Sequence, residues 1–471
     1  MKYSRVLFLT IKYSLGVSAF PASNMTKNSF LVGVGAAKKT DVAAQEKIIG
    51  TTRESAMART TSAAKAKAKA NARSNPIDKK SVKAKKLKNK SNVMRWAIHG
   101  VATELFHNVF LRTFRRVRRR LFDTNEGRLE AENGRRYRQP PRREIAVVTG
   151  ATGAIGSQIV HDLALRGYDV VIAARDATRG EELATEIRGL VRVTPIEGAK
   201  ESGGDDDIPR ISFIEYHADV PQSALNAASS IKELGPPLSI LINNAGIMGK
   251  SKKLTMHVNL LGPAYLTFAL LPLMSESATR TTLPTVINIG SSAHLRATHV
   301  LDDDSLPSGE NNDGKQSWID SLPEVSDDDL STYAQSKLAL MQFSTILRRW
   351  LPTSDPPIRI VDAHPGLVWT PLLRDHIGDR AVRTLTRTGL ANLLYKSSSE
   401  GAQAIVAALD SSQLSVATRE QVYFVNGEAG GYASSESASV DASFRLWKHV
   451  LAPAFEGKVD LPIGWEPRDV E

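Results

Sequence analysis

The chain has 471 residues and no cysteine, so disulfide bonds, thiolate catalysis and cysteine-ligated zinc are all excluded. Its formal net charge of +11 is unevenly distributed along the sequence. Residues 1–143 contain 33 Lys and Arg against 9 Asp and Glu, a surplus of 24 that leaves residues 144–471 with a net charge of −13. The body of the chain therefore gives no electrostatic reason to expect nucleic acid, and no uninterrupted run of about eighteen apolar residues predicts a membrane-spanning helix.

Residues 1–91 have the composition of a basic targeting leader. A charged start, an apolar centre over 6–11 and small residues around Phe20 follow the order of a secretory signal, although Lys12 interrupts it. The rest is rich in Ala, Ser, Thr and Lys, which predicts disorder and is typical of organelle transit peptides. The stretch 18–23, SAFPAS, resembles the cleavage motif of bipartite plastid leaders in algae with complex plastids. We therefore expect a plastid protein, with the mitochondrion, the endoplasmic reticulum and the cytosol as alternatives.

Residues 92–142 form a second segment, in which apolar residues recur at helical spacing from Met94 to Val117. Arginines gather towards its C-terminal side, at Arg112, Arg115, Arg116 and Arg118 to Arg120. The pattern predicts a basic amphipathic helix over about 93–122. Such a helix lies on an anionic membrane surface, packs against the body of the protein, or binds phosphates of nucleic acid, and the third is the least favoured.

The stretch 143–156, REIAVVTGATGAIG, marks the start of the predicted folded domain, residues 143–471. An apolar run over 145–148 predicts a buried strand, three spaced glycines predict a turn, and the amphipathic pattern over 157–166 predicts a helix. Three spaced glycines alone indicate only a tight turn. Between a strand and a helix they let the backbone approach a pyrophosphate, whose charge then lies at the helix N-terminus, so a dinucleotide site is predicted.

Further buried strands are predicted at 168–174, 211–217, 238–242, 285–289 and 358–363, with a helix over 179–188. This alternation predicts an α/β fold with a single doubly wound Rossmann-type parallel sheet flanked by helices, preceded by a largely disordered basic N-terminal extension. Arg175 directly follows the second strand, where an adenosine ribose lies in such a fold. An arginine there pairs with a 2′-phosphate, so NADP(H) is favoured and NAD(H) is the alternative. The other interpretation is that Arg175 is solvated and Asp176 only caps the next helix.

Several motifs then occur in a fixed order: TGATGAIG, AARD, ADV, LINNAGIM, STYAQSKLAL and DAHPGLVWT. Together they resemble the short-chain dehydrogenase/reductase family, and their wording is nearest to its retinol-dehydrogenase-like members, over residues 143 to about 452. The resemblance implies an NAD(P)-dependent enzyme acting on CH–OH groups, which interconverts a lipophilic alcohol and its carbonyl. One departure is that the middle glycine of the turn stands one place earlier than in the family's usual TGxxxGxG.

The YxxxK motif is Tyr333 to Lys337, whose side chains lie about one turn apart on one helix face. A neighbouring ammonium favours the phenolate, so the lysine is expected to lower the pKa of the tyrosine. The resemblance implies that Tyr333 is the general acid/base, that Lys337 also holds the ribose, and that Ser291 orients the substrate oxygen. Ser291 is chosen because it stands three residues past Asn288, and Ser292 is the alternate.

The family asparagine that supports the lysine and a proton relay matches Asn259, for which a buried amide at a helix bend is a compatible structural interpretation. The resemblance also implies a cofactor site running from the glycine turn to the loop after the sixth strand, where His364 is interpreted as structural and Thr370 bonds the carboxamide. The cofactor residues are Gly150, Thr152, Gly153, Ala154, Ile155, Gly156, Arg175, Asp219, Val220, Asn244, Ala245, Gly246, Tyr333, Lys337, Pro365, Gly366, Val368 and Thr370.

No metal site is predicted, because the aspartates at 205–207 are interpreted as a solvated loop. The acidic segment 296–330 is unusually long and predicts either a lid or a disordered loop between Ser291 and Tyr333. The expected partners are a small lipophilic alcohol or carbonyl compound and a membrane surface touched by 93–122, without nucleic acid; the oligomeric state stays open. The rival interpretation is a non-catalytic dinucleotide-binding scaffold whose basic arm contacts membrane or nucleic acid, and the complete Ser, Tyr, Lys and Asn set argues against it.

Overall fold

The computed structural model describes residues 91–109, 143–194, 208–249, 251–277, 283–301, 318–322, 328–351, 358–410 and 421–456, except 93 and 107. All of these belong to one compact unit. The predicted leader, apart from residue 91, lies outside the described residues, as do the aspartates at 205–207 and most of the acidic segment.

The described strands form one eight-stranded sheet in the order β3-β2-β1-β4-β5-β6-β7-β8, and every pairing is parallel except that of β7 with β8. The strands are β1 (Ile145–Thr149), β2 (Asp169–Ala174), β3 (Ile211–Glu215), β4 (Leu238–Asn243), β5 (Thr285–Ile289), β6 (Arg359–His364), β7 (Tyr423–Val425) and β8 (Glu428–Ala429). The strand order reverses between β1 and β4, because β2 and β3 extend the sheet on one side of β1 and the later strands extend it on the other. Ligands of doubly wound sheets bind at the carboxyl ends of the strands beside such a reversal.

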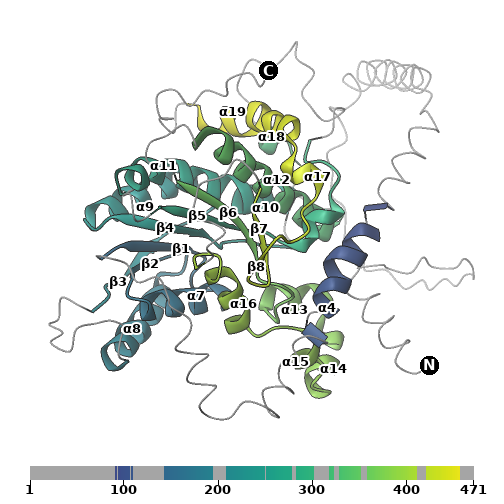
Figure 1. The fold of residues 1–471 in the computed structure, drawn as a ribbon, viewed down its shortest axis with the longest axis horizontal. Coiled ribbons are helices and arrows are strands. Elements are labelled where there is room, and N and C mark those ends of the chain that lie inside the picture. The colour runs from purple at the N-terminus through teal and green to yellow at the C-terminus, as the bar shows by residue number, and fades with distance from the viewer. Residues whose placement is uncertain are drawn as a thin grey trace, which may run out of the picture. The chain divides into compact units, whose positions relative to one another are not determined.

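Helices cover both faces of this sheet, with α9, α11 and α12 on one face and α7, α8 and α16 on the other (Figure 1). The helical elements are η1 (Trp96–Ala102), α4 (Thr103–Phe106), α7 (Ala154–Leu165), α8 (Ala177–Val193), α9 (Pro221–Glu233), α10 (Lys252–Met256), η4 (His257–Leu261), α11 (Gly262–Ser277), η5 (Ser292–Arg296), η7 (Trp318–Ser321), α12 (Asp329–Trp350), α13 (Pro371–Ile377), α14 (Asp379–Arg387), α15 (Leu390–Leu394), α16 (Ser398–Val406), α17 (Ser435–Ala438), α18 (Val440–Leu446), η10 (Trp447–Leu451) and α19 (Ala452–Phe455). The predicted doubly wound α/β fold is therefore confirmed.

The five central strands, β1, β2, β4, β5 and β6, are buried on both faces, which explains their largely apolar sequences. All five residues of β1 are buried; Val147 packs into the core under α9 and α11, whereas Ala146 and Val148 pack into the core under α7 and α16. The predicted strand boundaries agree with the structure to within about two residues. Helix α8 is longer than its prediction, because it begins directly after its cap at Asp176 and continues to Val193.

One helical run among the described residues, Lys252–Ser277, is long and apolar enough to span a membrane by length and mean hydropathy, which reaches 1.4. It is a core helix of the domain, since 78% of its most apolar window is buried. Tyr265 and Phe268 from this run meet Phe455 of the C-terminal helices edge to face. Its apolarity thus reflects packing between the sheet and the C-terminal helices.

The predicted amphipathic segment is described over its first part, η1 and α4. Trp96, Val101 and Leu105 are buried there in an apolar cluster with Leu295 and Leu330 of the folded domain. Packing against the body, one of the predicted alternatives, is what the structure shows for these residues. The arginine-rich part from 110 to 122 lies outside the described residues, so membrane contact by the segment stays a prediction.

Part of the acidic segment is anchored in the core. Trp318 and Ile319 in η7 are buried beside Val300, at 4% and 0% exposed. The two ends of the segment are joined by an ion pair, in which Arg296 lies 2.8 Å from Asp328. The residues at 302–317 and 323–327 lie outside the described part of the chain, so the lid and the loop both stay predictions.

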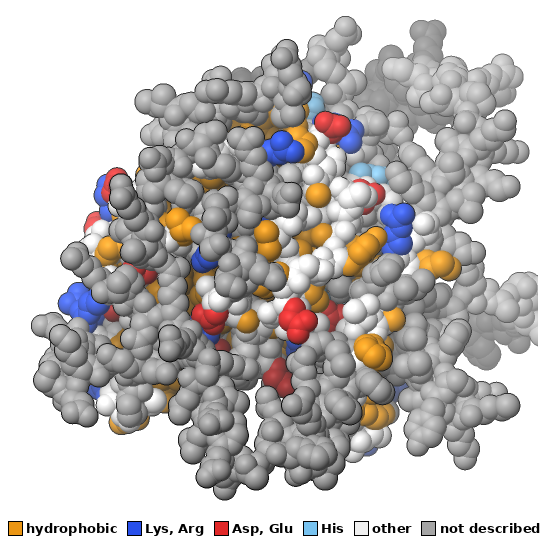
Figure 2. All heavy atoms as spheres, viewed as in Figure 1, with side chains coloured by type: hydrophobic (Ala, Val, Ile, Leu, Met, Phe, Trp, Pro, Cys, Tyr) orange, Lys and Arg blue, Asp and Glu red, His pale blue; other side chains and the backbone are white. Residues whose placement is uncertain are grey.

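Charged side chains of both signs are scattered over the face of the molecule in Figure 2. Among the described residues on this face, Lys and Arg do not gather into a stripe. This agrees with the net negative charge of residues 144–471.

Candidate active site

The glycine turn after β1 is built so that two of its positions accept only glycine. Gly150 has a φ of 59°, and a Cβ there would lie 2.8 Å from the Cα of Ala245. A Cβ on Gly156 would lie 2.5 Å from the carbonyl oxygen of Gly150 and 2.7 Å from Nδ2 of Asn244. The turn therefore packs its own backbone against the end of β4, which brings the start of α7 close to the sheet edge.

The N-terminus of α7 has the features of the predicted pyrophosphate site. The cap residue Gly153 is exposed and has no side chain with which to satisfy the first amide groups of the helix, which begins at Ala154. Thr152 and Ile155 are half-buried on either side of it. These free amides, together with the helix dipole, fit the phosphates of a dinucleotide.

The Asn-Asn-Ala-Gly run after β4 clamps the glycine turn. Nδ2 of Asn244 donates to the carbonyl oxygens of Thr149 and Gly150 at 2.8 and 3.1 Å. The hydroxyl of Thr149 in turn accepts from the backbone amides of Asn244 and Ala245, both at 3.0 Å. The predicted cofactor residues of β1 and β4 are thus brought together into one rigid unit.

Two arginines follow β2, where the adenosine end of the cofactor was predicted. Arg175 is exposed directly after β2, as predicted. Asp176 caps α8 by accepting from the backbone amide of Arg179 at 3.1 Å, as in the alternative interpretation. The guanidinium of Arg179 also reaches the carbonyl oxygen of Thr152 at 3.5 Å. Arg179 was not among the predicted cofactor residues.

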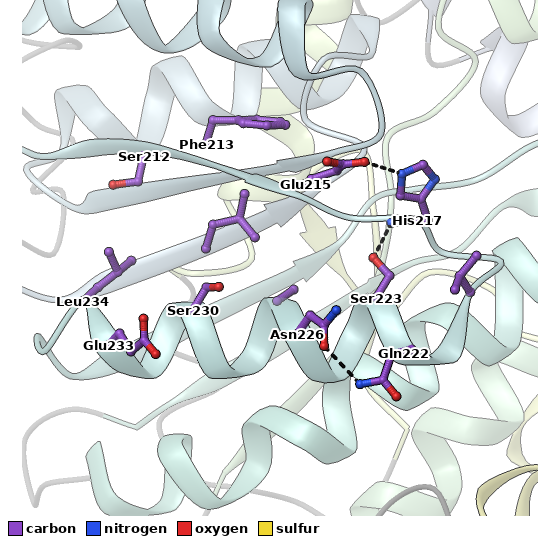
Figure 3. Close-up of a pocket in the computed structure, with 13 residues that line it drawn as sticks. Ser212, Phe213, Glu215, His217, Gln222, Ser223, Asn226, Ser230, Glu233 and Leu234 are labelled. Carbon is purple, nitrogen blue, oxygen red and sulfur yellow. Dashed lines mark hydrogen bonds and ion pairs between the residues drawn. The ribbon is translucent and has the colours of Figure 1, made fainter.

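Asp219 and Val220 follow β3, where Asp219 is half-buried and Val220 is 44% exposed at the start of α9. Val220 borders a surface groove of about 940 Å³ between β3 and α9. Figure 3 shows that polar side chains face this groove, with Glu215 paired to His217 at 2.8 Å. Because β3 is the edge strand and three strands separate it from β5, the groove is not the catalytic centre.

The catalytic serine predicted from the sequence lies two residues past β5. The hydroxyl of Ser291 accepts from the amide of Ala293 at 3.2 Å and lies close enough to the phenol of Tyr333 to lower its pKa. The alternate, Ser292, is buried, and its Cβ would lie 3.2 Å from a Cβ placed on Gly100 of η1. The structure thus places Ser291 beside Tyr333, whereas Ser292 faces the N-terminal helix.

The ionisation of the YxxxK pair differs from the expectation. Tyr333 is half-buried as a residue, but its phenol oxygen lies among protein atoms, and this burial raises the pKa of Tyr333 to about 12 while the hydroxyl of Ser291 lowers it. Burial likewise lowers the pKa of Lys337 to about 8. Nζ of Lys337 donates to the carbonyl oxygen of Ile289 at 2.8 Å and lies 5.8 Å from the Tyr333 ring centroid. The neighbouring charge of Lys337 was expected to lower the pKa of Tyr333. Desolvation, which raises this pKa, is the larger effect.

Asn259 is fully buried in the π-helical turn η4. Its Oδ1 accepts from the amide of Ile247 at 2.8 Å, and its Nδ2 donates to the carbonyl of Ile247 and to the hydroxyl of Ser336, both at 2.9 Å. A Cβ on Gly246 would lie 3.4 Å from Nζ of Lys337 and 3.5 Å from Oδ1 of Asn259. Asn259 therefore joins the loop after β4 to the helix that carries Tyr333 and Lys337.

A buried chain of hydrogen bonds lies under this site and was not predicted. Asn243 of β4 donates to Oδ1 of Asn288 at 2.8 Å, and Asn288 donates to the hydroxyl of Ser344 in α12 at 2.8 Å. Ser344 donates to Asp362 of β6 at 2.6 Å, and Arg348 pairs with the same carboxylate at 3.0 Å. Burial raises the pKa of Asp362, and Arg348 and Ser344 lower it. The chain ties three strands to the helix that carries Tyr333.

The loop after β6 carries the remaining predicted cofactor residues. Pro365 and Gly366 are buried, and Gly366 has a φ of 86°. Val368 is buried and pairs with Lys396 in an isolated parallel bridge. The hydroxyl of Thr370 caps α13, accepting from the amide of Leu373 at 3.4 Å.

Among the described residues there is no group of three or more His, Cys, Asp or Glu that could hold a metal ion.

Known proteins share this sequence pattern. A model of the short chain dehydrogenase family matches residues 144–300. Polyprenol dehydrogenase of Mus musculus is 33% identical over 283 residues, which cover 59% of this chain and 73% of that protein. Dehydrogenase/reductase SDR family member 13 of Bos taurus is 32% identical over 268 residues, covering 56% and 61%, and retinol dehydrogenase 12 of Mus musculus is 29% identical over 267 residues, covering 55% and 71%. The chain therefore belongs to the short-chain dehydrogenase/reductase family, has retinol-dehydrogenase-like relatives, and is an NAD(P)-dependent oxidoreductase acting on CH–OH groups.

Proposed function

We propose that this protein interconverts a lipophilic alcohol and its carbonyl compound with NADP(H), using Tyr333 as the general acid/base. The observation that carries the proposal is the position of Ser291 beside Tyr333 at the carboxyl end of β5, with Lys337 one turn further along α12. The bound nicotinamide supplies or accepts the hydride. The residues of the chain place the reacting oxygen and move its proton.

In the reducing direction, the hydroxyl of Ser291 holds the substrate oxygen and the phenol of Tyr333 donates its proton to that oxygen. The pKa of Tyr333, raised by burial to about 12, keeps the phenol protonated at neutral pH and ready to donate. In the oxidising direction the phenolate forms, and the ammonium of Lys337 is the nearby positive charge that stabilises it. Asn259 keeps α12 in place through its bond to Ser336.

The lipophilic character of the substrate is inferred from the side chains around Tyr333. The buried Leu295 and Leu330 and the partly buried Met248, Leu367 and Trp369 belong to the same apolar cluster. Apolar walls with a few convergent polar groups favour a hydrocarbon chain that ends in an oxygen function. The relatives named for polyprenol and retinol support the same class of substrate.

The preference for NADP(H) is inferred from the adenosine end of the site. Two guanidinium groups, those of Arg175 and Arg179, belong to this end, and a guanidinium matches the geometry of a 2′-phosphate. The nearby carboxylate of Asp176 already accepts from a backbone amide of α8. Asp176 is therefore engaged elsewhere and does not serve as the acidic side chain that bonds the ribose hydroxyl of NAD(H).

The test is NADPH oxidation by the full chain with all-trans-retinal, a polyprenal and a short aldehyde as substrates. We expect Tyr333→Phe to lower kcat by about 10²- to 10⁴-fold, because the proton donor is removed. Tyr216→Phe is the matched control, since the hydroxyl of Tyr216 is buried beside β3 and has no hydrogen-bond partner among the described residues. Full turnover by Tyr333→Phe would overturn the assignment.

A further inference from the structure

We propose that Glu104, from the N-terminal helix α4, is a positioning residue for the loop 365–370 that follows β6. The inference rests on the proposed function, in which this loop contacts the nicotinamide end of the cofactor. Glu104 is only 2% exposed, which is unusual for a carboxylate. A buried carboxylate costs several kcal/mol unless it is paired, so its partners define what it does.

The partners of Glu104 come from three other parts of the chain. Oε1 lies 3.1 Å from Nε2 of His364 at the end of β6, and Oε2 accepts from Nδ2 of Asn426 at 3.4 Å. Burial would raise the pKa of Glu104, but the charges of His364 and Lys396 and the hydrogen bonds hold it below its usual value. Glu104 is therefore an anion that balances the positive charge gathered at this loop.

Lys396 is the partner that touches the loop most extensively. Its Nζ donates to the carbonyl oxygen of Pro365 at 3.2 Å and also to Oδ1 of Asn426. Its backbone amide donates to the carbonyl of Leu367 at 2.8 Å, and its carbonyl accepts from the amide of Trp369 at 2.9 Å. Three residues of the loop are thus held by one lysine, whose buried charge is compensated by Glu104.

The side chains of Glu104, Lys396 and Asn426 pack directly against the backbone of Gly366. A Cβ at this position would lie 2.4 Å from Oδ1 of Asn426 and 3.0 Å from both Oε2 of Glu104 and Nζ of Lys396. Asn426, itself at a φ of 58°, donates its backbone amide to the carbonyl of His364 at 3.2 Å. The side chains therefore fix the two peptide units at Pro365 and Gly366, and Glu104 is the member supplied from outside residues 143–471.

The rest of the N-terminal helix brings Glu104 to this place. Trp96, Val101 and Leu105 pack into the apolar cluster that includes Leu330. Nδ2 of Asn108 donates to the carbonyl of Leu394 at 3.0 Å, which ties the helix to α15 (Figure 1). These contacts hold the helix on the body without touching the charge cluster. They allow the electrostatic role of Glu104 to be separated from simple attachment of the helix.

The experiment measures the Kd for NADPH by fluorescence titration of the full chain, together with the KM and kcat of the reductase assay. Glu104→Gln leaves Lys396 buried without its counter-charge, so we expect about a tenfold weaker Kd and a raised KM for NADPH. In a Lys396→Met background the same substitution should weaken binding by less than about twofold, because the two residues act as a pair. Glu104→Asp should recover part of the affinity.

Asn108→Ala is the matched control, because it removes a buried tether of the same helix and leaves the charges in place. We expect it to lower the unfolding midpoint and to leave the Kd for NADPH unchanged. An equal loss of NADPH affinity in Asn108→Ala and Glu104→Gln would overturn the proposal in favour of a structural role. So would wild-type affinity in Glu104→Gln.

Two further outcomes are distinguished by the same set of variants. If Glu104→Gln does not fold, the double variant Glu104→Gln/Lys396→Met, which removes the charges of both residues, carries the test, and wild-type affinity in it overturns the proposal. Absence of NADPH binding by the wild-type chain overturns the proposed function, and this inference falls with it. Normal NADPH binding by the wild type and by Glu104→Gln overturns the role of Glu104 alone.

Discussion

The substitution Gly156→Ala tests whether the glycine turn is held by steric exclusion. In a helix an alanine is favoured over glycine by about 1 kcal/mol. The new Cβ would, however, lie 2.5 Å from the carbonyl oxygen of Gly150 and 2.8 Å from the Cα of Ala151, where ordinary contacts begin at 3.4 Å. Both atoms belong to the backbone, so the turn itself must move. Overpacking of this kind costs about 1–3 kcal/mol, which cancels or exceeds the gain in helix propensity.

Gly189→Ala provides the matched control, because Gly189 is an exposed residue of α8 and a Cβ there would meet no atom within 4 Å. We expect Gly189→Ala to raise the free energy of unfolding by about 0.5–1 kcal/mol with an unchanged Kd for NADPH. Gly156→Ala should lower or fail to raise it, and should weaken NADPH binding about tenfold, because the amides of α7 shift away from the phosphates. Urea unfolding and fluorescence titration measure the two quantities. Equal stabilisation and unchanged affinity in both variants would refute the steric reasoning.

Two further predictions concern the ends of the cofactor site. Arg175→Ala should raise the KM for NADPH several-fold and leave that for NADH nearly unchanged, because only NADPH carries the 2′-phosphate; an equal effect on both cofactors would reject this role of Arg175. For Lys337, burial lowers the pKa from its ordinary 10.5 to about 8, so the unfolded chain holds an additional proton between these values. The free energy of unfolding should therefore rise with pH from about 8 to 10.5, by up to about 3 kcal/mol. Urea unfolding across this range should show a flatter dependence for Lys337→Met, and an unaltered slope would contradict the pKa.

The sheet could be predicted from the sequence because its central strands are buried on both faces. The run 145–148 is apolar throughout and 238–242 contains one polar residue, Ser239, which two-sided burial explains. The glycine turn could be predicted for a related reason, since Gly156 reports a close approach between backbones. These features depend on short-range sterics and hydrophobic burial, which are visible in a few consecutive residues.

The ionisation state and the N-terminal helix could not be predicted in the same way. The YxxxK spacing indicates that Tyr333 and Lys337 are near each other, but the pKa of each depends on how deeply the folded chain buries it. Glu104 belongs to a basic segment without family motifs, and its partners His364 and Lys396 follow it by more than 250 residues in the sequence. Such contacts arise from tertiary structure and leave no periodic pattern.

The ion pair between Arg296 and Asp328 affects how the sequence of this enzyme can evolve. Arg296 ends the short helix that begins after Ser291, and Asp328 caps the helix of Tyr333, so the pair closes the base of the intervening segment. The entropy of closing a flexible loop grows only with the logarithm of its length, about 0.6 kcal/mol for each doubling. Insertions between 302 and 317 can therefore accumulate while the spacing of serine and tyrosine is preserved. The positions of Ser291 and Tyr333 are therefore insulated from changes in the length of the chain between Arg296 and Asp328.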